Sequence, residues 1–211
     1  MKILELFAGT RSIGKAFERH GHDVTSIDID PKFKDCITAD AYEYLEKHGE
    51  EGYDVIWASP CCTTYSVAGI RYHRARDENG RFCKPSSDYA EECDENNTRL
   101  FNWFNEHRNI LWFIENPRAN MQHMDFAKCL SDLKTSLCYC QYGFPFMKPT
   151  NIWTSCKNPE WKPMCYYGNP HHPKPKYSKS AFSDMKNGYH RGEIPDKLCE
   201  HIVKICEEAC E

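Results

Sequence analysis

Apolar runs of strand length alternate with amphipathic segments of helix length over the first third of the chain. Such alternation is typical of βαβ units, in which successive strands lie parallel and helices cover the sheet. The pattern therefore predicts an α/β fold with a mostly parallel central sheet. We expect strands over residues 2–8, 23–29, 35–39 and 55–58, and helices over residues 13–20 and 42–48.

The second half of the chain continues this pattern less regularly. The stretch from residue 144 to about 189 is rich in Pro, Lys, Tyr and His and has little periodicity, which indicates an irregular insertion. We expect helices over 97–107, 126–133 and 194–207, with strands over 109–114 and 135–141. This predicts a main α/β domain over 1–150, a small insertion over 151–189 and a C-terminal helix within 190–211 that packs back on the main domain.

Composition narrows the class of protein. The chain has thirteen cysteines with irregular spacing, it opens on strand-like residues, and no apolar run approaches the length of a membrane-spanning helix. These features predict reduced thiols in a cytoplasmic protein without a membrane partner. The formal net charge of -4 neither requires nor excludes nucleic acid as a partner, so any basic surface must be local.

Two acidic residues follow predicted strands in a way that suits a nucleoside cofactor. The first strand ends in Ala8-Gly9 and runs into a helix, so the backbone can approach a ligand closely. Asp28 ends the second strand about twenty residues later, where a carboxylate can hold ribose hydroxyls. Asp40 follows the third strand and can accept a hydrogen bond from an adenine amino group. The alternative is that these are ordinary turn and cap residues.

A thiol and a carboxyl group also follow predicted strands. Cys61 and Cys62 come directly after the apolar run that ends in Ser59-Pro60, and Glu115 follows the run over 109–114. Because the carboxyl ends of parallel strands meet at one edge of a sheet, we expect both groups to face one cleft. A thiolate nucleophile beside a proton donor suits covalent activation of a pyrimidine ring. A capping or salt-bridged carboxylate is the alternative for Glu115.

Taken in order, these motifs resemble those of the DNA cytosine-5 methyltransferases, in the compact form that phages and prophages carry. The resemblance covers nearly the whole chain and rests on LELFAGTRSIGKAF, SIDID, TADA, VIWASPCCTTYSVAG, FIENPRA, CQYGFPFMKPTNIW and RGEIPDKL. It implies a Rossmann-like S-adenosylmethionine-dependent methyltransferase fold. It assigns Cys62, Glu115 and Asn116 to catalysis, and assigns S-adenosylmethionine binding to Phe7, Gly9, Thr10, Asp28, Ile29, Asp40, Ala41 and Pro60.

The sequence departs from the family pattern at three places. The family has Pro-Pro-Cys where this chain has Pro60-Cys61-Cys62, and alignment on the following Tyr-Ser makes Cys62 the nucleophile, with Cys61 as the alternative. Arg11 stands where the family commonly has glycine, which we expect cofactor binding to tolerate. The usual Gln-x-Arg-x-Arg pattern is missing, and Lys148 is the nearest cation to its position.

The resemblance implies that Cys62 adds to cytosine C6 while Glu115 binds the N3 and N4 edge of a base flipped out of duplex DNA. Within the long loop expected over 71–94, the basic segment over 71–84 then becomes a candidate for closing over the base and contacting phosphates, with a solvated surface loop as the alternative. For a target we expect double-stranded DNA, with a restriction enzyme as a further partner and a monomer or weak dimer as the assembly. The resemblance assigns nucleic-acid contacts to Arg71, Arg74, Arg76, Arg118 and Lys148.

Other readings of the chain stay open. Related enzymes of this architecture methylate tRNA, and the motif order does not separate the two substrates. A catalytically inactive homologue that retains DNA or cofactor affinity is a third reading. Methylation of an amino group is disfavoured, because that chemistry places an aromatic residue where this chain has cysteine. We expect no metal, since the insertion's candidates match no common zinc spacing: Cys156, Cys165, His171 and His172.

Overall fold

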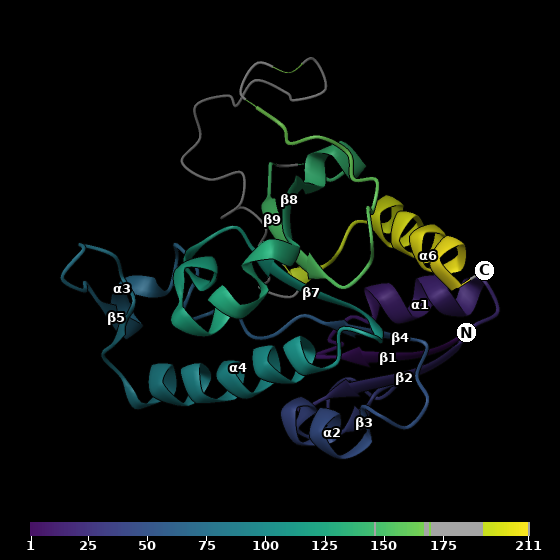
Figure 1. Cartoon of the computed structure of the whole chain (residues 1–211), viewed down its shortest axis with the longest axis horizontal. Helices are drawn as coiled ribbons and strands as arrows, with labels where there is room; N and C mark the ends of the chain where they lie inside the picture. Colours follow the sequence, from purple (N-terminus) through teal and green to yellow (C-terminus); the bar gives the residue numbers. More distant parts are fainter. Residues whose placement is uncertain (146, 167–168, 170–191, 211) are drawn as a thin grey trace.

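The computed structural model describes residues 1–145, 147–166, 169 and 192–210 (Figure 1). The main strands are β1 (Lys2–Leu6), β2 (Asp23–Asp28), β3 (Ile37–Thr38), β4 (Val55–Ala58), β7 (Leu111–Pro117), β8 (Lys134–Cys138) and β9 (Pro149–Thr154). The α-helices are α1 (Ser12–Arg19), α2 (Ala41–His48), α3 (Ile70–His73), α4 (Asp88–Glu106) and α6 (Asp196–Cys210). Short elements complete the described chain: β5 (Arg74–Ala75), β6 (Lys84–Pro85) and the 3₁₀ helices η1 (Asn120–His123), η2 (Asp125–Leu133) and η3 (Tyr139–Tyr142).

A seven-stranded sheet in the order β3-β2-β1-β4-β7-β9-β8 forms the centre of the molecule. The strands from β3 to β7 are mutually parallel, whereas β9 runs antiparallel to both β7 and β8. The predicted α/β fold with a mostly parallel, Rossmann-like sheet is therefore confirmed. In such a sheet the carboxyl ends of the parallel strands share one edge, where ligands bind.

Helices cover both faces of the sheet, so its inner strands are apolar on both sides. Successive side chains alternate between the two faces: Ile3 and Val55 pack with α1 and α6, while Leu4 and Ile56 pack with α2 and α4. Figure 1 shows the two pairs of helices on opposite sides of the strands. This double covering explains why the strands appear in the sequence as nearly continuous apolar runs.

Helix α4 begins earlier than the sequence pattern indicated. We expected a helix from residue 97, but the structure starts it at Asp88. Ser87 caps it, since its Oγ accepts a hydrogen bond from the Ala90 N–H at 3.2 Å. The extra turns remove part of the expected long loop over 71–94. The first turns carry few apolar residues, so the apolar pattern alone did not reveal them.

Strand β9 was not predicted at all. It begins with Pro149 and includes Asn151, which are unusual residues for a buried strand. Asn151 is nonetheless fully buried, because its amide group bonds to Ser136 Oγ at 2.7 Å and to Gln122 Oε1 at 3.2 Å. The expected boundary between residues 150 and 151 therefore falls inside a strand of the central sheet.

The C-terminal helix α6 packs against α1 at the covered face of the sheet. Arg19 of α1 pairs with Asp196 at 2.5 Å and with Glu200 at 2.5 Å, so charge as well as apolar contact joins the two helices. Most of the expected insertion over 151–189 lies outside the described residues. Among the residues that are described, no helix is both long and apolar enough to cross a membrane.

Candidate active site

The turn after β4 carries both candidate nucleophiles, and the neighbouring strand holds it in place. Trp57 Nε1 donates to Ser59 Oγ at 2.8 Å, which fixes the chain as it leaves the sheet. Asn116 of β7 donates its Nδ2 hydrogen to the Pro60 carbonyl oxygen at 2.9 Å in a buried contact. The structure thus joins Pro60 and Asn116, which lie far apart in the sequence. The backbone that presents the two thiols is fixed by the strand that carries Glu115.

The two adjacent thiols lie in different surroundings. Cys61 is exposed, and its Sγ lies 3.1 Å from the Tyr89 hydroxyl. Cys62 is largely buried; burial first and the Glu115 carboxylate second raise the pKa of its thiol to about 11, while Lys148 opposes the shift. The effect of Glu115 and Lys148 on the pKa of the Cys62 thiol indicates that both charged groups lie near its sulfur.

We expected Glu115 to follow the strand over 109–114, but the structure places it within β7. The reason is that β9 pairs alongside and extends β7, with Ile152 opposite Glu115. The side chain is 6% exposed, and its Oε1 accepts a hydrogen bond from the Tyr139 hydroxyl at 2.9 Å. Lys148 is also buried, with its Nζ 4.4 Å from the centre of the Tyr139 ring.

No sequence motif pointed to Tyr139, since its contact with Glu115 depends on the unpredicted strand that lies between β7 and β8. The group of buried and half-buried residues that meets here is called the Cys62 corner. It consists of Pro60, Cys62, Glu115, Asn116, Tyr139 and Lys148.

The carboxyl ends of β1 and β2 form a second part of this edge. Asp28 accepts hydrogen bonds from the Gly9 N–H at 2.8 Å and from the Asp30 N–H at 2.9 Å, so the predicted pair of Gly9 and Asp28 is in contact. Phe7 and Gly9 have φ angles of 56° and 48°, which shows a tightly turned backbone. Next to Asp28, Ile29 is 69% exposed. A carboxylate beside an exposed apolar side chain fits a ribose with its attached base.

The other predicted cofactor residues have local structural partners. Asp40 caps α2, since its Oδ1 accepts hydrogen bonds from the N–H groups of Tyr42 at 2.8 Å and Glu43 at 3.0 Å. The alternative of a cap residue is thus what the structure contains at this position. Ala41 is buried, and the Thr10 hydroxyl lies 2.8 Å from the Ser12 hydroxyl. Asp40 and Thr10 are both half-buried, so neither is fully enclosed by these contacts.

Arg11, which stands where the sequences that this chain resembles commonly have glycine, turns its side chain away from the carboxyl ends of β1 and β2. Its φ of 57° is the left-handed conformation that glycine adopts easily, so the substitution strains the backbone. The side chain folds back, donating from Nε to Ser26 Oγ at 3.0 Å and pairing with Glu18. Ser26 in turn donates to the buried Glu5 at 2.8 Å. Arg11 therefore belongs to a polar cluster under the turn.

Glu5 holds the start of α1 against β1. Its carboxylate interacts with the backbone N–H groups of Gly14 and Ile13, and burial raises its pKa to about 7 against these favourable contacts. A side chain at Gly14 has no room, because a Cβ there would lie 2.5 Å from Glu5 Oε2. The glycine of this motif is thus required by a buried carboxylate as well as by the turn.

Of the predicted nucleic-acid contacts, Arg71, Arg76 and Arg118 are exposed. Arg76 stacks on the Phe82 ring, with its guanidinium carbon 4.4 Å from the ring centre. Two neighbours in this region are apolar and strongly exposed, since Val67 is 85% and Tyr72 is 81% accessible. Lys148 lies in the Cys62 corner and not on the outer surface.

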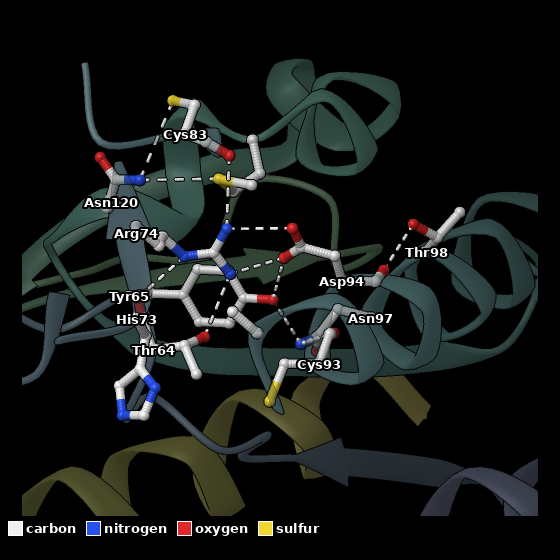
Figure 2. A network of polar contacts seen from close by, with 12 residues as sticks. Thr64, Tyr65, His73, Arg74, Cys83, Cys93, Asp94, Asn97, Thr98 and Asn120 are labelled. Atoms are coloured by element: carbon white, nitrogen blue, oxygen red, sulfur yellow. Dashed lines mark hydrogen bonds and ion pairs between the residues drawn. The ribbon is translucent and has the colours of Figure 1, made fainter. Parts of the chain in front are cut away.

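Arg74 contradicts its predicted role, because its side chain is completely buried. The guanidinium makes five hydrogen bonds, two to Asp94, two to Thr64 and one to the Cys83 carbonyl. It also stacks on the Tyr65 ring, 4.3 Å from its centre. Figure 2 shows this side chain enclosed between the ring and the acid. With every N–H group of the guanidinium used, Arg74 has none left for a phosphate.

The surrounding contacts tie the segment after the cysteines to helix α4. Tyr65 donates its hydroxyl hydrogen to Asp94 Oδ1 at 2.7 Å and accepts one from Asn97 Nδ2 at 3.1 Å. We call these residues the Arg74 network (Figure 2): Thr64, Tyr65, Arg74, Asp94 and Asn97. The basic segment is consequently anchored at Arg74, and not free along its whole length.

The cysteines of the expected insertion do not lie together. Cys165 lies close to Cys140, and Cys138 Sγ lies 3.3 Å from Cys140 Sγ, whereas Cys156 is placed near Cys206 and Cys210. Among the described residues no group of three His, Cys, Asp or Glu side chains is arranged to hold a metal ion. His171 and His172 lie outside the described residues.

Comparison with known proteins gives likeness in fold. No family model and no curated protein matches the sequence. A protein assigned as a DNA modification methyltransferase, encoded within a prophage of E. coli, is 14% identical with a TM-score of 0.47 over 73% of this chain and 46% of its own. The S. pombe Dnmt2 methyltransferase is 16% identical with a TM-score of 0.42, over 76% of this chain and 51% of its own.

A Dnmt2 variant from Spodoptera frugiperda gives a similar result. It is 17% identical with a TM-score of 0.42, over 72% of this chain and 49% of its own. This chain therefore spans about half the length of the solved structures that it matches. At these identities the likeness concerns the fold.

Proposed function

We propose that this protein transfers a methyl group from S-adenosylmethionine to C5 of a cytosine in DNA. The observation that carries the proposal is the Cys62 corner. The Cys62 thiol follows β4, and the charge of Glu115 on the adjacent strand β7 raises its pKa. Asn116 Nδ2 of β7 donates to the Pro60 carbonyl oxygen at 2.9 Å, which fixes the turn that carries the thiol. A soft nucleophile beside a proton carrier is the pair that activation of a pyrimidine ring requires.

Glu115 carries a proton between the thiol and the base. At neutral pH the Cys62 thiol is protonated, because burial and Glu115 raise its pKa to about 11. As the base enters, the thiol gives its proton to the Glu115 carboxylate and its sulfur forms a bond to C6. Glu115 then donates the proton to N3, and the ring electrons move to C5. Once C5 carries the methyl group, a base removes the C5 proton and the C5–C6 double bond re-forms as the bond from sulfur to C6 breaks. The proton on N3 then returns through Glu115 to the sulfur, so the thiol and the carboxylate are both restored.

The residues at the ends of β1 and β2 hold the cofactor. Asp28 would bind ribose hydroxyls, the exposed Ile29 would cover the base, and the backbone between Phe7 and Thr10 would line the methionine side. When bound, S-adenosylmethionine supplies an electrophilic methyl group. Asn116 Oδ1 is buried without a hydrogen-bond partner in the described part of the chain, so this edge has an acceptor left for a ligand.

DNA is the proposed substrate, and its phosphates would meet the exposed cations Arg71, Arg76 and Arg118. A cytosine inside a duplex hides its C5 and C6 atoms, so the base has to be flipped out to reach Cys62. Sequence recognition would use the insertion after β9, which lies mostly outside the described residues. Because that insertion is short, we propose a short or relaxed target site.

A methyl-transfer assay with paired cysteine variants tests this proposal. Purified protein and S-adenosylmethionine with a tritiated methyl group are offered unmethylated DNA and, separately, tRNA. We expect label at cytosine C5 of DNA, a loss of at least about 10³-fold with Cys62→Ser, and retained transfer with Cys61→Ser. Label on tRNA alone would move the function to RNA. Cofactor binding without any transfer would identify an inactive homologue.

A further inference from the structure

The carboxylate in the Cys62 corner has one tightly held oxygen. The Tyr139 hydroxyl donates to Glu115 Oε1 at 2.9 Å, and both residues are buried, with Tyr139 at 0% exposure. The other carboxylate oxygen accepts no side-chain hydrogen bond from the part of the chain that the structure describes. One oxygen is thus anchored and the other is left for the thiol and the base.

Tyr139 is itself fixed from three sides. Its backbone N–H donates to the Lys148 carbonyl oxygen at 3.1 Å, and Lys148 Nζ lies 4.4 Å from the centre of its ring. The Thr150 hydroxyl interacts with the Tyr139 oxygen, and Phe144 packs against the ring at 5.8 Å between centres. A donor held this firmly can hold its acceptor, because neither group has freedom to move away.

Tyr139 therefore supplies a fixed hydrogen bond to the carboxylate of the Cys62 corner. We propose that Tyr139 is a positioning residue that holds Glu115 in the orientation required for proton transfer to cytosine N3. The inference rests on the proposed function and assigns a role to a residue that the sequence motifs did not mark. It acts through Glu115, without contact to the substrate.

The substitution Tyr139→Phe tests the role of the hydroxyl alone. Phenylalanine retains the ring, so the stacking of Lys148 and the packing of Phe144 survive. The matched control is Tyr142→Phe on the same 3₁₀ helix: Tyr142 is also buried, but its hydroxyl contacts the Lys162 N–H at 3.1 Å and His201 Nδ1 at 3.2 Å. Each variant removes one buried hydroxyl, and only one of them touches Glu115.

The measurement is the single-turnover rate of methyl transfer to DNA with enzyme in excess, together with the Kd for DNA and for S-adenosylmethionine. We expect Tyr139→Phe to lower the rate by about 10- to 100-fold with both Kd values unchanged, because misplacement of a reacting group affects chemistry more than binding. Tyr142→Phe should stay within about twofold of wild type.

Combination with Glu115→Gln shows whether Tyr139 acts through Glu115. If it does, the double variant is no slower than Glu115→Gln alone, to within about twofold. A rate for Tyr139→Phe equal to wild type, an equal loss with Tyr142→Phe, or a further 10-fold loss in the double variant would each overturn the assignment. Should Tyr139→Phe fail to fold, Thr150→Val serves instead, with a loss of a few-fold expected and no loss counting against the role.

The wild-type protein separates failure of this inference from failure of the proposed function. If wild type transfers methyl groups to C5 and Tyr139→Phe does so equally well, only the role of Tyr139 is lost. If wild type transfers none while S-adenosylmethionine binds, the proposed function fails and the positioning role fails with it.

Discussion

The Arg74 network and the Cys62 corner both border the segment that follows β4, and they differ in how they treat charge. In the Arg74 network the charged guanidinium meets Asp94 at 2.6 Å and has a partner for every N–H group. In the Cys62 corner, burial and a neighbouring carboxylate raise the pKa of the thiol to about 11 instead of favouring its ionised form.

The difference separates residues that hold the structure from the residues to which we assign the proposed chemistry. A buried charge with all its partners stabilises one conformation and has no capacity left for a ligand. A half-buried thiol whose pKa is raised by burial and by a neighbouring carboxylate keeps its proton until a substrate enters. Basic character in the sequence did not make this distinction, since Arg74 and Arg71 looked alike.

The largest effect we predict belongs to the carboxylate of the Cys62 corner. Glu115→Gln should lower the rate of methyl transfer by about 10²- to 10⁴-fold, because an amide cannot carry the proton to N3. The free energy of unfolding should change little, since glutamine can still accept the hydrogen bond from Tyr139. Asp94→Asn is the matched change in the Arg74 network, and it should reduce stability far more than activity per folded molecule. Transfer assays and urea denaturation measure the two effects. If Asp94→Asn lowered the transfer rate more and Glu115→Gln lowered the free energy of unfolding more, the assignment of the two groups to structure and to chemistry would be wrong.

Next in size is the loss of the buried guanidinium. Arg74→Met keeps the length of the side chain but leaves Asp94 and the Tyr65 ring without their partner. We expect the free energy of unfolding to fall by about 3 kcal/mol, at the lower end of the range for broken buried pairs, because Asp94 retains some contact with solvent. Urea denaturation of the variant beside Arg71→Met, which alters an exposed arginine, measures the difference. Equal stability of these two variants would show that burial of Arg74 contributes nothing.

Glu5 offers a third buried case, in which the pH dependence can be given a sign. Burial raises its pKa from 4.5 to about 7 in the folded protein, so the folded state holds a proton that the unfolded state has released. Stability from this group is therefore full below pH 4.5 and is lost as the pH rises through 7. Glutamine has no proton to release, so the free energy of unfolding of Glu5→Gln should rise by about 3 kcal/mol relative to that of wild type as the pH goes from 4.5 to above 7. Urea denaturation of both proteins across this pH range measures the difference. A constant difference in free energy of unfolding at every pH would show that Glu5 has no raised pKa.

The smallest effect sharpens the electrostatics of the Cys62 corner. With a thiol pKa of about 11, alkylation of Cys62 by iodoacetamide should speed up about tenfold per pH unit between pH 7 and 9. Lys148→Met should slow it by a few-fold at fixed pH, because Lys148 lowers that pKa. Lys162→Met is the control, since Lys162 stacks on Tyr142 at 5.0 Å instead. Mass spectrometry of the Cys62 peptide gives the alkylation rate. An equal slowing by both variants would show that Lys148 has no specific effect on the pKa of Cys62.

The sequence by itself determined the fold class and the edge of the sheet where the site lies. Doubly covered parallel strands must be apolar on both faces, so their runs stand out, and polar residues that end them must meet at one edge. The contact of Asp28 with Gly9 at 2.8 Å and the neighbourhood of Cys62 and Glu115 follow from that rule. The start of α4 was not predicted, because the turns that follow its Ser87 cap carry few apolar residues.

Only the tertiary structure decided how the polar residues pair. Strand β9 carries Asn151 in a buried position, which local propensity opposes and which hydrogen bonds to neighbouring side chains make tolerable. That strand extends β7 through Glu115, and the turn after β8 brings Tyr139 to its carboxylate. Burial likewise assigned Arg74 to structure. Such outcomes depend on contacts between residues distant in the chain, and a hydrogen bond between distant side chains leaves no periodic trace in the sequence.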